Sequence, residues 1–545
     1  MTMLGYMMDT PLLTTDLLRH GLRNSPDQQI VSRLVEGGIH SYSFREAGAR
    51  IAQLAHALKA MGIEEGDRVG VMAWNTYRQL ELYYAVAGIG AVCHTINPRL
   101  GPENAAYVMN HAGDKVVFYD ETFKPLAEGL APHLPKVERY IAMSPGNEEV
   151  PADFAGKPVS VQDDLMKGLP EEYDWPSFDE NTSCGMCYTS GTTGKPKGVV
   201  YTHRSQVLHA LVTSLPSVVG FAPDEPVMAV VPMFHVNAWG LPFSALLGGT
   251  KLVLPGPGLD APRLYDMIEE TGTAYSLGVP TLWLNLLKHV EDNGFKFSTL
   301  KYVLSGGSAL SERIIRGFER LGVRVRQGWG MTEMSPVGTT NFEEEGFFDL
   351  PEDERIKKQL QQGKPVPLVD MRIVSPTGEV LPHDGETDGH LQVRGPWVLS
   401  EYYLHDEPTL TADGWFDTGD VAVIHKDGRM QITDRAKDAI KSGGEWLSTI
   451  EIENAALSHP DVENAAVIGM PHPKWQERPL LIVQMDIHAK ATPEDVLQFT
   501  RDRLPKISWP DDIKVVKNIP LGATGKVLKT ELRKTFADYK LPTAS

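Results

Sequence analysis

The order of apolar and polar residues along the chain predicts helices that alternate with short, buried strands. Residues 43–61 follow the period of an amphipathic helix, with Ser43 in position to cap its first turn and Gly62 to end it. The β-branched runs at 68–72 (RVGVM) and 115–119 (KVVFY) predict strands. Buried strands that alternate with helices are typical of an α/β layer structure with a largely parallel sheet.

The pattern changes from about Pro367 onward. The segments VDMRIVSPTGEVLP and GHLQVRGPWV predict short strands joined by Thr-Gly and Asp-Gly turns. After Asp434 a small α/β pattern begins, in which helices at 448–457 and 492–504 flank the strands VENAAVIGM and PLLIVQM. The segment DRAKDAIKSGG precedes the first of these helices and is the best candidate for a hinge.

We therefore predict an α/β protein with a large and a small domain. The large N-terminal domain (1–436) consists of α/β subdomains and a β-rich part at about 367–436. The small α+β C-terminal domain (437–545) is expected to be mobile. A length of 545 residues is enough for three or four domains or subdomains, each with its own core.

The composition excludes several classes of protein. With 42% apolar and 23% charged residues, the chain resembles ordinary soluble proteins rather than disordered ones. The net charge of −19 argues against a protein that coats nucleic acid, because such a protein needs a basic face. The three cysteines are too few for a secreted disulfide scaffold. Cys184 and Cys187 form a lone CxxC without further zinc ligands nearby, so we predict packed thiols in a reducing cytosol.

The chain shows neither a secretory signal nor a membrane span. A signal would need a basic start, but the first basic residue is Arg19. The longest apolar run covers residues 82–93 and falls short of the ~18 residues that cross a bilayer. We expect a cytoplasmic protein without an integral membrane segment.

The segment YTSGTTGKPKG (188–198) is the strongest local sign of chemistry. Its three glycines let the backbone approach a ligand, while its hydroxyls and two lysines supply donors and charge for phosphate. A P-loop would need four residues between Gly and Gly-Lys, followed by Ser or Thr. Here only two residues separate Gly191 from Gly194, and Pro196 follows Lys195. The segment predicts a phosphate loop of another type, with a flexible surface loop as the alternative.

Three weaker clusters follow along the chain. In QGWGMTE (327–333), Trp329 could offer its face to a planar base, and Thr332 and Glu333 are suitable hard ligands for Mg²⁺. In GWFDTGD (414–420), Asp420 could bind vicinal ribose hydroxyls. IPLGATGK places Lys526 after two glycines. Each cluster alone could equally be a turn with a solvated charge.

Together these segments resemble one family, the adenylate-forming (ANL) enzymes, which include acyl-CoA synthetases, luciferases and peptide-synthetase adenylation domains. YTSGTTGKPKG, GWGMTE, GWFDTGD, DRAKD, SGGEWLS and GATGK occur here in the family's order, over nearly the whole chain. VPMFHVNAWG and HPKWQERPL are most similar to the branch of fatty acyl-CoA synthetases and acid–CoA ligases. LGATGK departs from the family's usual terminal loop at Gly522, which puts a contact around Lys526 in doubt.

The resemblance implies an ATP-dependent, AMP-forming acid–CoA ligase that uses Mg²⁺, with CoA as co-substrate. A carboxylate attacks the α-phosphate of ATP to give acyl-adenylate and pyrophosphate, and the CoA thiol then displaces AMP. The acid would be a medium- to long-chain fatty acid, or alternatively a short thioether acid (methylmercaptopropionate) or an aryl acid. An amino acid fits less well, because it would need a carboxylate to pair its ammonium. A homodimer through the large domain is a further implication.

The resemblance also assigns roles to individual residues. Lys526 bridges the carboxylate and the phosphate, His235 lies near the carboxylate, and Thr332 contacts the α-phosphate. Glu333 and Thr189 serve Mg²⁺. Lys437 is the hinge, and the acid pocket is formed by Trp239, Val279, Pro280 and Gly306. The residues expected to bind ATP or border the pantetheine channel are Thr189, Ser190, Gly191, Thr192, Thr193, Gly194, Lys197, Ser308, Gln327, Gly328, Trp329, Asp420, Arg435, Ser442, Gly443, Gly444, Glu445 and Trp446.

Two other classes of function remain open from the residues alone. A phosphate-loop NTPase that couples hydrolysis to motion would release ADP and phosphate instead of AMP and pyrophosphate. A nucleotide-binding scaffold with a decayed site is the second class, and the presence of Lys526, Glu333 and Asp420 argues against it.

Overall fold

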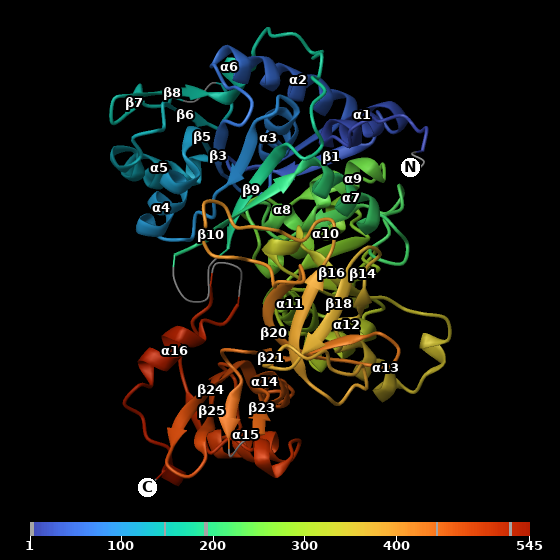
Figure 1. Cartoon of the computed structure of the whole chain (residues 1–545), viewed down its shortest axis with the longest axis vertical. Helices are drawn as coiled ribbons and strands as arrows, with labels where there is room; N and C mark the ends of the chain where they lie inside the picture. The colour runs from blue at the N-terminus through green and yellow to red at the C-terminus, as the bar shows by residue number, and fades with distance from the viewer. Residues whose placement is uncertain (1–4, 147–148, 190–194, 443–444, 523–525, 545) are drawn as a thin grey trace.

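The computed structural model describes residues 5–146, 149–189, 195–442, 445–522 and 526–544. Two large sheets form most of the structure above the small C-terminal domain, which is orange to red in Figure 1. The predicted α/β fold class, with a large N-terminal and a smaller C-terminal domain, is confirmed. The chain passes from the last strand of the large domain to the small domain between Arg435 and Ile440. The boundary at 436/437 itself stays a prediction.

The first large sheet has nine strands, with parallel pairing between β1, β12, β11, β13, β14 and β15. Antiparallel strands complete both edges. Its strands, in spatial order, are β17 (Lys364–Pro365), β16 (Val337–Asn341), β15 (Arg324–Gly330), β14 (Tyr302–Ser305), β13 (Tyr275–Gly278), β11 (Val227–Ala229), β12 (Leu252–Leu254), β1 (Gln29–Arg33) and β2 (Ile39–Ser43).

The second large sheet has eight strands and is also parallel in its centre. The predicted strands at 68–72 and 115–119 are confirmed as β3 and as most of β5. In spatial order the strands are β10 (Lys197–Thr202), β9 (Ser183–Thr189), β4 (Val92–Thr95), β3 (Arg68–Met72), β5 (Asp114–Tyr119), β6 (Arg139–Ala142), β8 (Lys157–Val161) and β7 (Asp153–Phe154).

Helix α3 (Tyr77–Gly88) packs against strands of both large sheets, and all of its residues are buried. The apolar run at 82–93 therefore belongs to the interior of the domain, where it forms the end of α3 and the start of β4. No helix in the described part of the chain is long and apolar enough to cross a membrane. Cys93, Cys184 and Cys187 are buried free thiols, as predicted for the CxxC pair, and burial raises their pKa values.

The other helices of the large domain cover its sheets. The predicted helix at 43–61 is confirmed as α2, whose N-cap Ser43 accepts a hydrogen bond from the Glu46 N–H. The bounds are α1 (Thr14–Asn24), α2 (Phe44–Ala60), α4 (Pro102–Ala112), α5 (Lys124–Leu130), α6 (Gln162–Met166), α7 (His203–Thr213), α8 (Val236–Trp239), α9 (Leu241–Leu247), α10 (Ala261–Thr271), α11 (Pro280–Asn293), α12 (Glu312–Arg320) and α13 (Glu352–Gln359).

The β-rich part predicted from about Pro367 forms an antiparallel four-stranded sheet. The predicted Thr-Gly turn (377–378) follows its first strand, and Asp-Gly pairs lie in the same connection to the second strand. Its strands are β18 (Asp370–Val374), β19 (Gly389–Arg394), β20 (Phe416–Ile424) and β21 (Met430–Arg435).

The small domain is a five-stranded sheet with helices on both faces. Helices α14 and α15 contribute to one apolar cluster, and α16 contributes to a second. The ion pair between Lys288 of α11 and Asp486 joins the small domain to the large one. The elements are β22 (Ile440–Ser442), β23 (Glu445–Leu447), α14 (Thr449–Leu457), β24 (Val462–His472), β25 (Gln476–Met485), α15 (Pro493–Arg501), β26 (Asp512–Val515) and α16 (Lys529–Thr535).

Candidate active site

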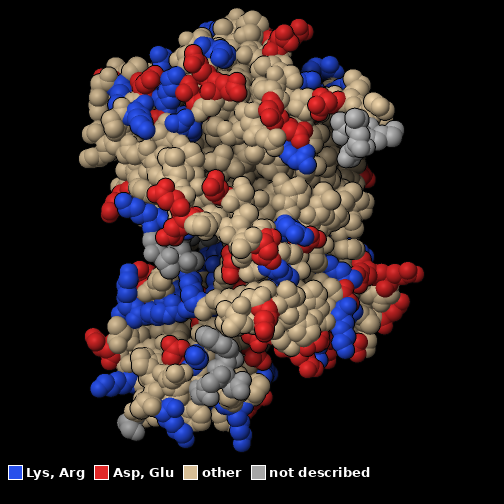
Figure 2. Space-filling model, in the orientation of Figure 1, with Lys and Arg blue, Asp and Glu red and all other residues tan. Residues whose placement is uncertain are grey.

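A cavity of about 1120 Å³ lies at the carboxyl ends of β13, β14 and β15 and reaches the small domain. Loops at this end of parallel strands converge, so residues distant in sequence meet there. Although the chain is acidic, Lys and Arg side chains gather where the small domain meets the large one (Figure 2). The predicted site residues that line the cavity are Thr189, Lys197, His235, Trp239, Gly306, Gly328, Trp329, Thr332, Glu333, Arg435 and Lys526.

The predicted phosphate loop connects two antiparallel strands of the second sheet. Thr189 ends β9 and is paired with Lys197, which begins β10. The Lys197 ammonium lies 4.7 Å from the centre of the Tyr402 ring, and Lys195 lies 4.7 Å from that of Tyr107. Both ammonium groups therefore pack on aromatic faces at the cavity. Ser190, Gly191, Thr192, Thr193 and Gly194 lie outside the described residues.

Glu333 is a buried carboxylate at the cavity, in a short 3₁₀ turn that follows β15. The Tyr402 hydroxyl donates to its Oε1 at 2.8 Å, and the Tyr201 hydroxyl donates to the Thr332 carbonyl at 2.9 Å. Burial raises the pKa of Glu333, while the bond from Tyr402 opposes this change. The two tyrosines fix the backbone and the carboxylate of this turn.

The donors at the cavity suit a magnesium ion that is bound mainly through substrate phosphates. The described residues contain no group of three or more His, Cys, Asp or Glu that could hold a metal by themselves. Mg²⁺ in nucleotide sites commonly takes one or two protein oxygens and completes its shell with phosphate and water. The Glu333 carboxylate and the Thr189 hydroxyl fit such a shell.

Asp420 connects two of the other predicted nucleotide residues. Its Oδ2 accepts a hydrogen bond from the Trp329 indole N–H at 2.9 Å, and its Oδ1 lies 3.2 Å from the Arg435 Nε. The Trp329 ring packs so closely on Gly338 that a Cβ there would lie 2.6 Å from it. The indole, the carboxylate and the guanidinium thus form one group beside the cavity.

Lys526 brings the small domain into the cavity. Its Cε lies 3.9 Å from the position that a Cβ on Gly307 would occupy, just after β14. Burial lowers the Lys526 pKa to about 8, an effect to which Arg435 contributes and which Asp420 and Glu333 oppose. Burial, with the Lys526 charge adding to it, also lowers the His235 pKa to about 4. At neutral pH, His235 can therefore donate a hydrogen bond but carries no charge.

The turn that follows His235 has an unusual backbone. Residues 236–239 all have φ between 47° and 57°, a left-handed conformation that costs non-glycine residues roughly 1–2 kcal/mol each. The turn brings His235 and Trp239 to the same cavity. A Cβ on Gly306 would lie 3.0 Å from the Trp239 ring, so the indole packs on that glycine. Strained backbone of this kind is typical of functional sites, and here it lies where the chain places His235 and Trp239 at the cavity.

Several predicted residues lie outside this cavity. Ser308, Gln327 and Asp420 line an adjoining cavity of about 1380 Å³ between the domains. The buried Gln327 Oε1 has no hydrogen-bond partner within the described structure. Val279 and Pro280, at the start of α11, line neither cavity, and neither do Lys437 and Ser442. Glu445 and Trp446 belong to β23, while Gly443 and Gly444 lie outside the described residues.

The sequence did not single out several residues that line the cavity. Tyr402 contacts both Glu333 and Lys197, yet it lies in an irregular segment with no recognisable pattern. The lining also includes aliphatic, aromatic and threonine residues from separate elements of the chain, and none differs from ordinary core in sequence. These residues are Thr213, Val219, Phe221, Leu277, Leu304 and Thr340.

Comparison with known proteins assigns the class that this fold and site define. Residues 18–403 match the family model of the AMP-binding enzyme, and residues 451–526 match that of the AMP-binding enzyme C-terminal domain. The chain therefore belongs to the AMP-binding enzymes, and the adenylate-forming family predicted from its motifs is confirmed.

Two curated relatives cover almost the full chain. The 3-methylmercaptopropionyl-CoA ligase of Ruegeria lacuscaerulensis is 44% identical over 98% of this chain and 99% of its own. The medium-chain-fatty-acid–CoA ligase of Ectopseudomonas oleovorans is 44% identical over 100% and 99%. Among solved structures, the anthranilate CoA ligase AuaEII with anthranoyl-AMP superposes with a TM-score of 0.86. The two sequences are 23% identical, and the superposition covers 97% of this chain and 98% of the ligase chain. The comparison therefore shows the shared fold.

Proposed function

We propose that the protein is an AMP-forming acid–CoA ligase that activates an apolar carboxylic acid. One observation carries this proposal: Lys526 of the small domain, the Glu333 turn and several apolar side chains all line the same cavity. Such a cavity can bring a carboxylate, a nucleotide phosphate and an ammonium together. The relatives described above are named as CoA ligases, which supports the same class.

In the first half-reaction, two anions must approach each other. The Lys526 ammonium offsets their repulsion and the charge that grows on the α-phosphate. Lys195 and Lys197 lie at the junction between the phosphate loop and the start of β10. Their positive charges attract the triphosphate. His235 donates from a neutral ring and orients the carboxylate. Bound Mg²⁺ supplies further positive charge for the phosphates.

In the second half-reaction, the CoA thiol must reach the acyl-adenylate while Lys526 occupies the cavity in the present orientation. The small domain therefore turns about the segment at Lys437. The ion pair between Lys288 and Asp486 joins the two domains now and has to break in this motion. Lys437 is exposed in the turn between β21 and β22, which connects the two domains.

The walls of the cavity favour an acid with an apolar body. Its lining includes the apolar side chains of Val219, Phe221, Leu277 and Leu304 beside the charged groups expected to bind the nucleotide. A medium-chain fatty acid would gain ~0.8 kcal/mol for each methylene buried against such walls. The bulky Trp239 ring packs on Gly306 at the wall of the cavity, and this observation favours methylmercaptopropionate or an aryl acid as the second candidate.

The order of the two half-reactions gives a direct test of the proposed activity. If the adenylate forms before CoA binds, acid-dependent exchange of labelled pyrophosphate into ATP should proceed without CoA. The measurement uses straight-chain acids, methylmercaptopropionate and benzoate, with AMP release followed in parallel. Release of ADP, or exchange that requires CoA, would contradict the proposal.

A second prediction concerns the acid pocket. Trp239→Ala removes the ring that packs on Gly306 and lengthens the apolar space. We expect the preferred chain length to increase, with a change of about fourfold in kcat/KM for each methylene gained or lost. The KM for ATP should stay nearly constant. The measurement is kcat/KM across straight-chain acids for the wild-type protein and the variant. If the two profiles are parallel, Trp239 belongs to the ordinary core and does not line the acid pocket.

A homodimer and a cytoplasmic location are the remaining parts of the proposal. The family resemblance alone supports the homodimer, and the free buried thiols support the location. Analytical ultracentrifugation of the purified protein tests the dimer. A mass close to the 60.2 kDa of one chain would exclude it at the concentrations used.

A further inference from the structure

The segment that follows β19 leaves the four-stranded sheet and runs beside β10 of the second large sheet (Figure 1). Residues 399–403 of this segment contact two separate parts of the cavity wall. The Leu399 N–H donates to the Glu333 carbonyl at 2.8 Å, and the Tyr403 N–H donates to the Gly198 carbonyl at 2.9 Å. The segment therefore joins the Glu333 turn to the start of β10.

Tyr402 lies between these two backbone contacts, and its side chain lines the cavity. Its hydroxyl donates to the Glu333 carboxylate at 2.8 Å, and the Lys197 ammonium lies 4.7 Å from the centre of its ring. The ring is partly buried and packs against an apolar cluster that includes Val199 and Tyr201. One side chain, held by this packing, thus contacts an anionic and a cationic group of the site.

The Glu333 carboxylate depends on Tyr402 for its orientation. Among the described residues, no other side chain donates a hydrogen bond to it. Each carboxylate oxygen has two lone pairs, so a single bond to Oε1 restrains the group and leaves acceptor capacity for a cation in the cavity. Without the tyrosine hydroxyl, this buried carboxylate would lose its one side-chain donor.

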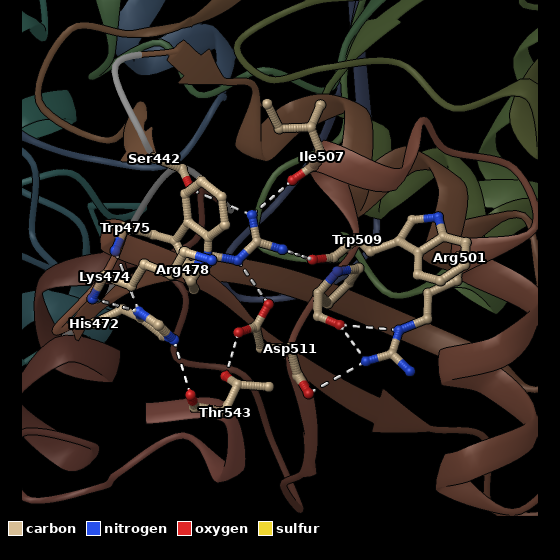
Figure 3. Close-up of polar contacts among 11 residues, drawn as sticks. Ser442, His472, Lys474, Trp475, Arg478, Arg501, Ile507, Trp509, Asp511 and Thr543 are labelled. Carbon is tan, nitrogen blue, oxygen red and sulfur yellow. Dashed lines mark hydrogen bonds and ion pairs between the residues drawn. The ribbon is translucent and has the colours of Figure 1, made fainter. Parts of the chain in front are cut away.

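A second network of polar contacts surrounds Arg478 in the small domain (Figure 3). Its guanidinium donates to the Ser442 hydroxyl at 3.2 Å and to the Asp511 carboxylate at 2.7 Å. Arg478, Ser442 and Asp511 line neither of the two cavities. That network joins segments of the small domain to one another, whereas the contacts of Tyr402 reach groups at the cavity itself.

We propose that Tyr402 is a positioning residue for the metal–nucleotide complex. Its hydroxyl orients the Glu333 carboxylate for Mg²⁺, and its ring holds the Lys197 ammonium for phosphate. This inference rests on the proposed ligase activity and assigns a role in its first half-reaction. Both groups serve the same triphosphate, so a link between them removes freedom that binding would otherwise have to restrict. Contacts to a metal ligand of this kind commonly set metal affinity.

Tyr402→Phe removes the hydroxyl and keeps the ring. We expect the affinity of the ATP-bound protein for Mn²⁺, a paramagnetic substitute for Mg²⁺, to fall about 10–100-fold. The affinity for ATP without metal should stay within about twofold, because Lys197 still packs on an aromatic face. Electron paramagnetic resonance of free Mn²⁺ and equilibrium dialysis of ATP with EDTA measure the two affinities, and neither measurement needs an acid or CoA.

Tyr402→Leu removes the ring as well. The affinity for ATP without metal should now fall about 2–30-fold, the range for a lost cation–π contact. Unchanged metal-free affinity would overturn the role of the ring in holding Lys197. If the leucine variant does not fold, Tyr402→Met takes its place, because methionine adapts better to an irregular gap.

Tyr403→Phe is the matched control. Tyr403 is the next residue of the same segment and also lines the cavity, with its ring centre 5.5 Å from that of His111. Its hydroxyl has no hydrogen-bond partner within the described parts of the chain. We expect both affinities to be unchanged in this variant. A loss of Mn²⁺ affinity equal to that of Tyr402→Phe would show that the bond to Glu333 is not the cause.

Glu333→Gln identifies the route by which the hydroxyl acts. If Tyr402 works through the carboxylate, its replacement by Phe in the Glu333→Gln background should change the Mn²⁺ affinity by less than about threefold. Unchanged Mn²⁺ affinity in Tyr402→Phe alone, or an undiminished effect in the Glu333→Gln background, overturns the inference. Wild-type protein that binds Mn²⁺ and ATP but shows no pyrophosphate exchange with any acid would overturn the proposed activity instead.

Discussion

Lys526→Ala is expected to lose acyl-adenylate formation and to keep thioester formation. In the present orientation, the ammonium lies in the cavity beside the residues of the first half-reaction. Removal of one such electrostatic contact typically costs about 10²–10³ in rate. The measurement compares pyrophosphate exchange with the conversion of supplied acyl-adenylate and CoA to thioester.

A conservative variant separates charge from shape at this position. Lys526→Arg keeps a cation and should retain part of the exchange activity, because the guanidinium is bulkier but still positive. Equal loss of both half-reactions in Lys526→Ala would mean that the side chain supports the fold of its loop or acts in both steps.

The lowered pKa of Lys526 predicts a descending limb in the pH profile of adenylation. Burial depresses this pKa to about 8, so the ammonium is fully present below that pH and is lost as the pH rises through it. We expect kcat/KM for exchange to fall above about pH 8, because this parameter reports the free enzyme. In Lys526→Arg the limb should move beyond the accessible range. A wild-type profile that stays flat up to pH 10 would contradict this assignment.

Lys437→Pro should have the opposite effect on the two half-reactions. Proline fixes φ near −65° and so restricts rotation at this turn. The hydrogen bonds of the turn come from the backbone N–H groups of Ala436, Asp438 and Ala439, so proline at 437 removes none of them. We expect adenylation to survive, while thioester formation falls by roughly 10²-fold or more. The same pair of half-reaction assays measures both.

Lys437→Ala distinguishes the backbone from the side chain. It keeps φ free, and it should retain at least about tenfold more thioester formation than the proline variant. If both variants lose the second step equally, the Lys437 side chain matters and not its backbone. If the proline variant keeps both steps, the rotation is centred elsewhere.

Much of the fold was predictable because its signals are local. The cap at Ser43, the strand RVGVM and the turns of the four-stranded sheet each depend on residues that are neighbours in the chain. The same holds for the small domain, where Ser448 and Thr492 cap the two predicted helices. Burial and backbone propensity act over a few residues, so the sequence pattern reports them directly.

The residues on the nucleotide side of the site were also predictable, because they occur in short sequence motifs that follow a fixed order along the chain. Lys197, Thr332, Glu333 and Lys526 line one cavity, as the resemblance implies. Their roles in the reaction stay predictions, to be tested by the half-reaction assays above.

Only the tertiary structure decided which distant side chains support these residues. Tyr402 reaches Glu333 across 69 positions of the chain, and Arg478 reaches Ser442 across 36. The left-handed backbone at 236–239 contains no glycine, so the sequence gives no local signal that would predict it. Local patterns encode capping, alternation and turns, whereas a hydrogen bond between remote segments depends on how whole sheets pack. The local sequence thus specified the elements and the reacting groups, and the packing of the domains brought those groups and their supports together.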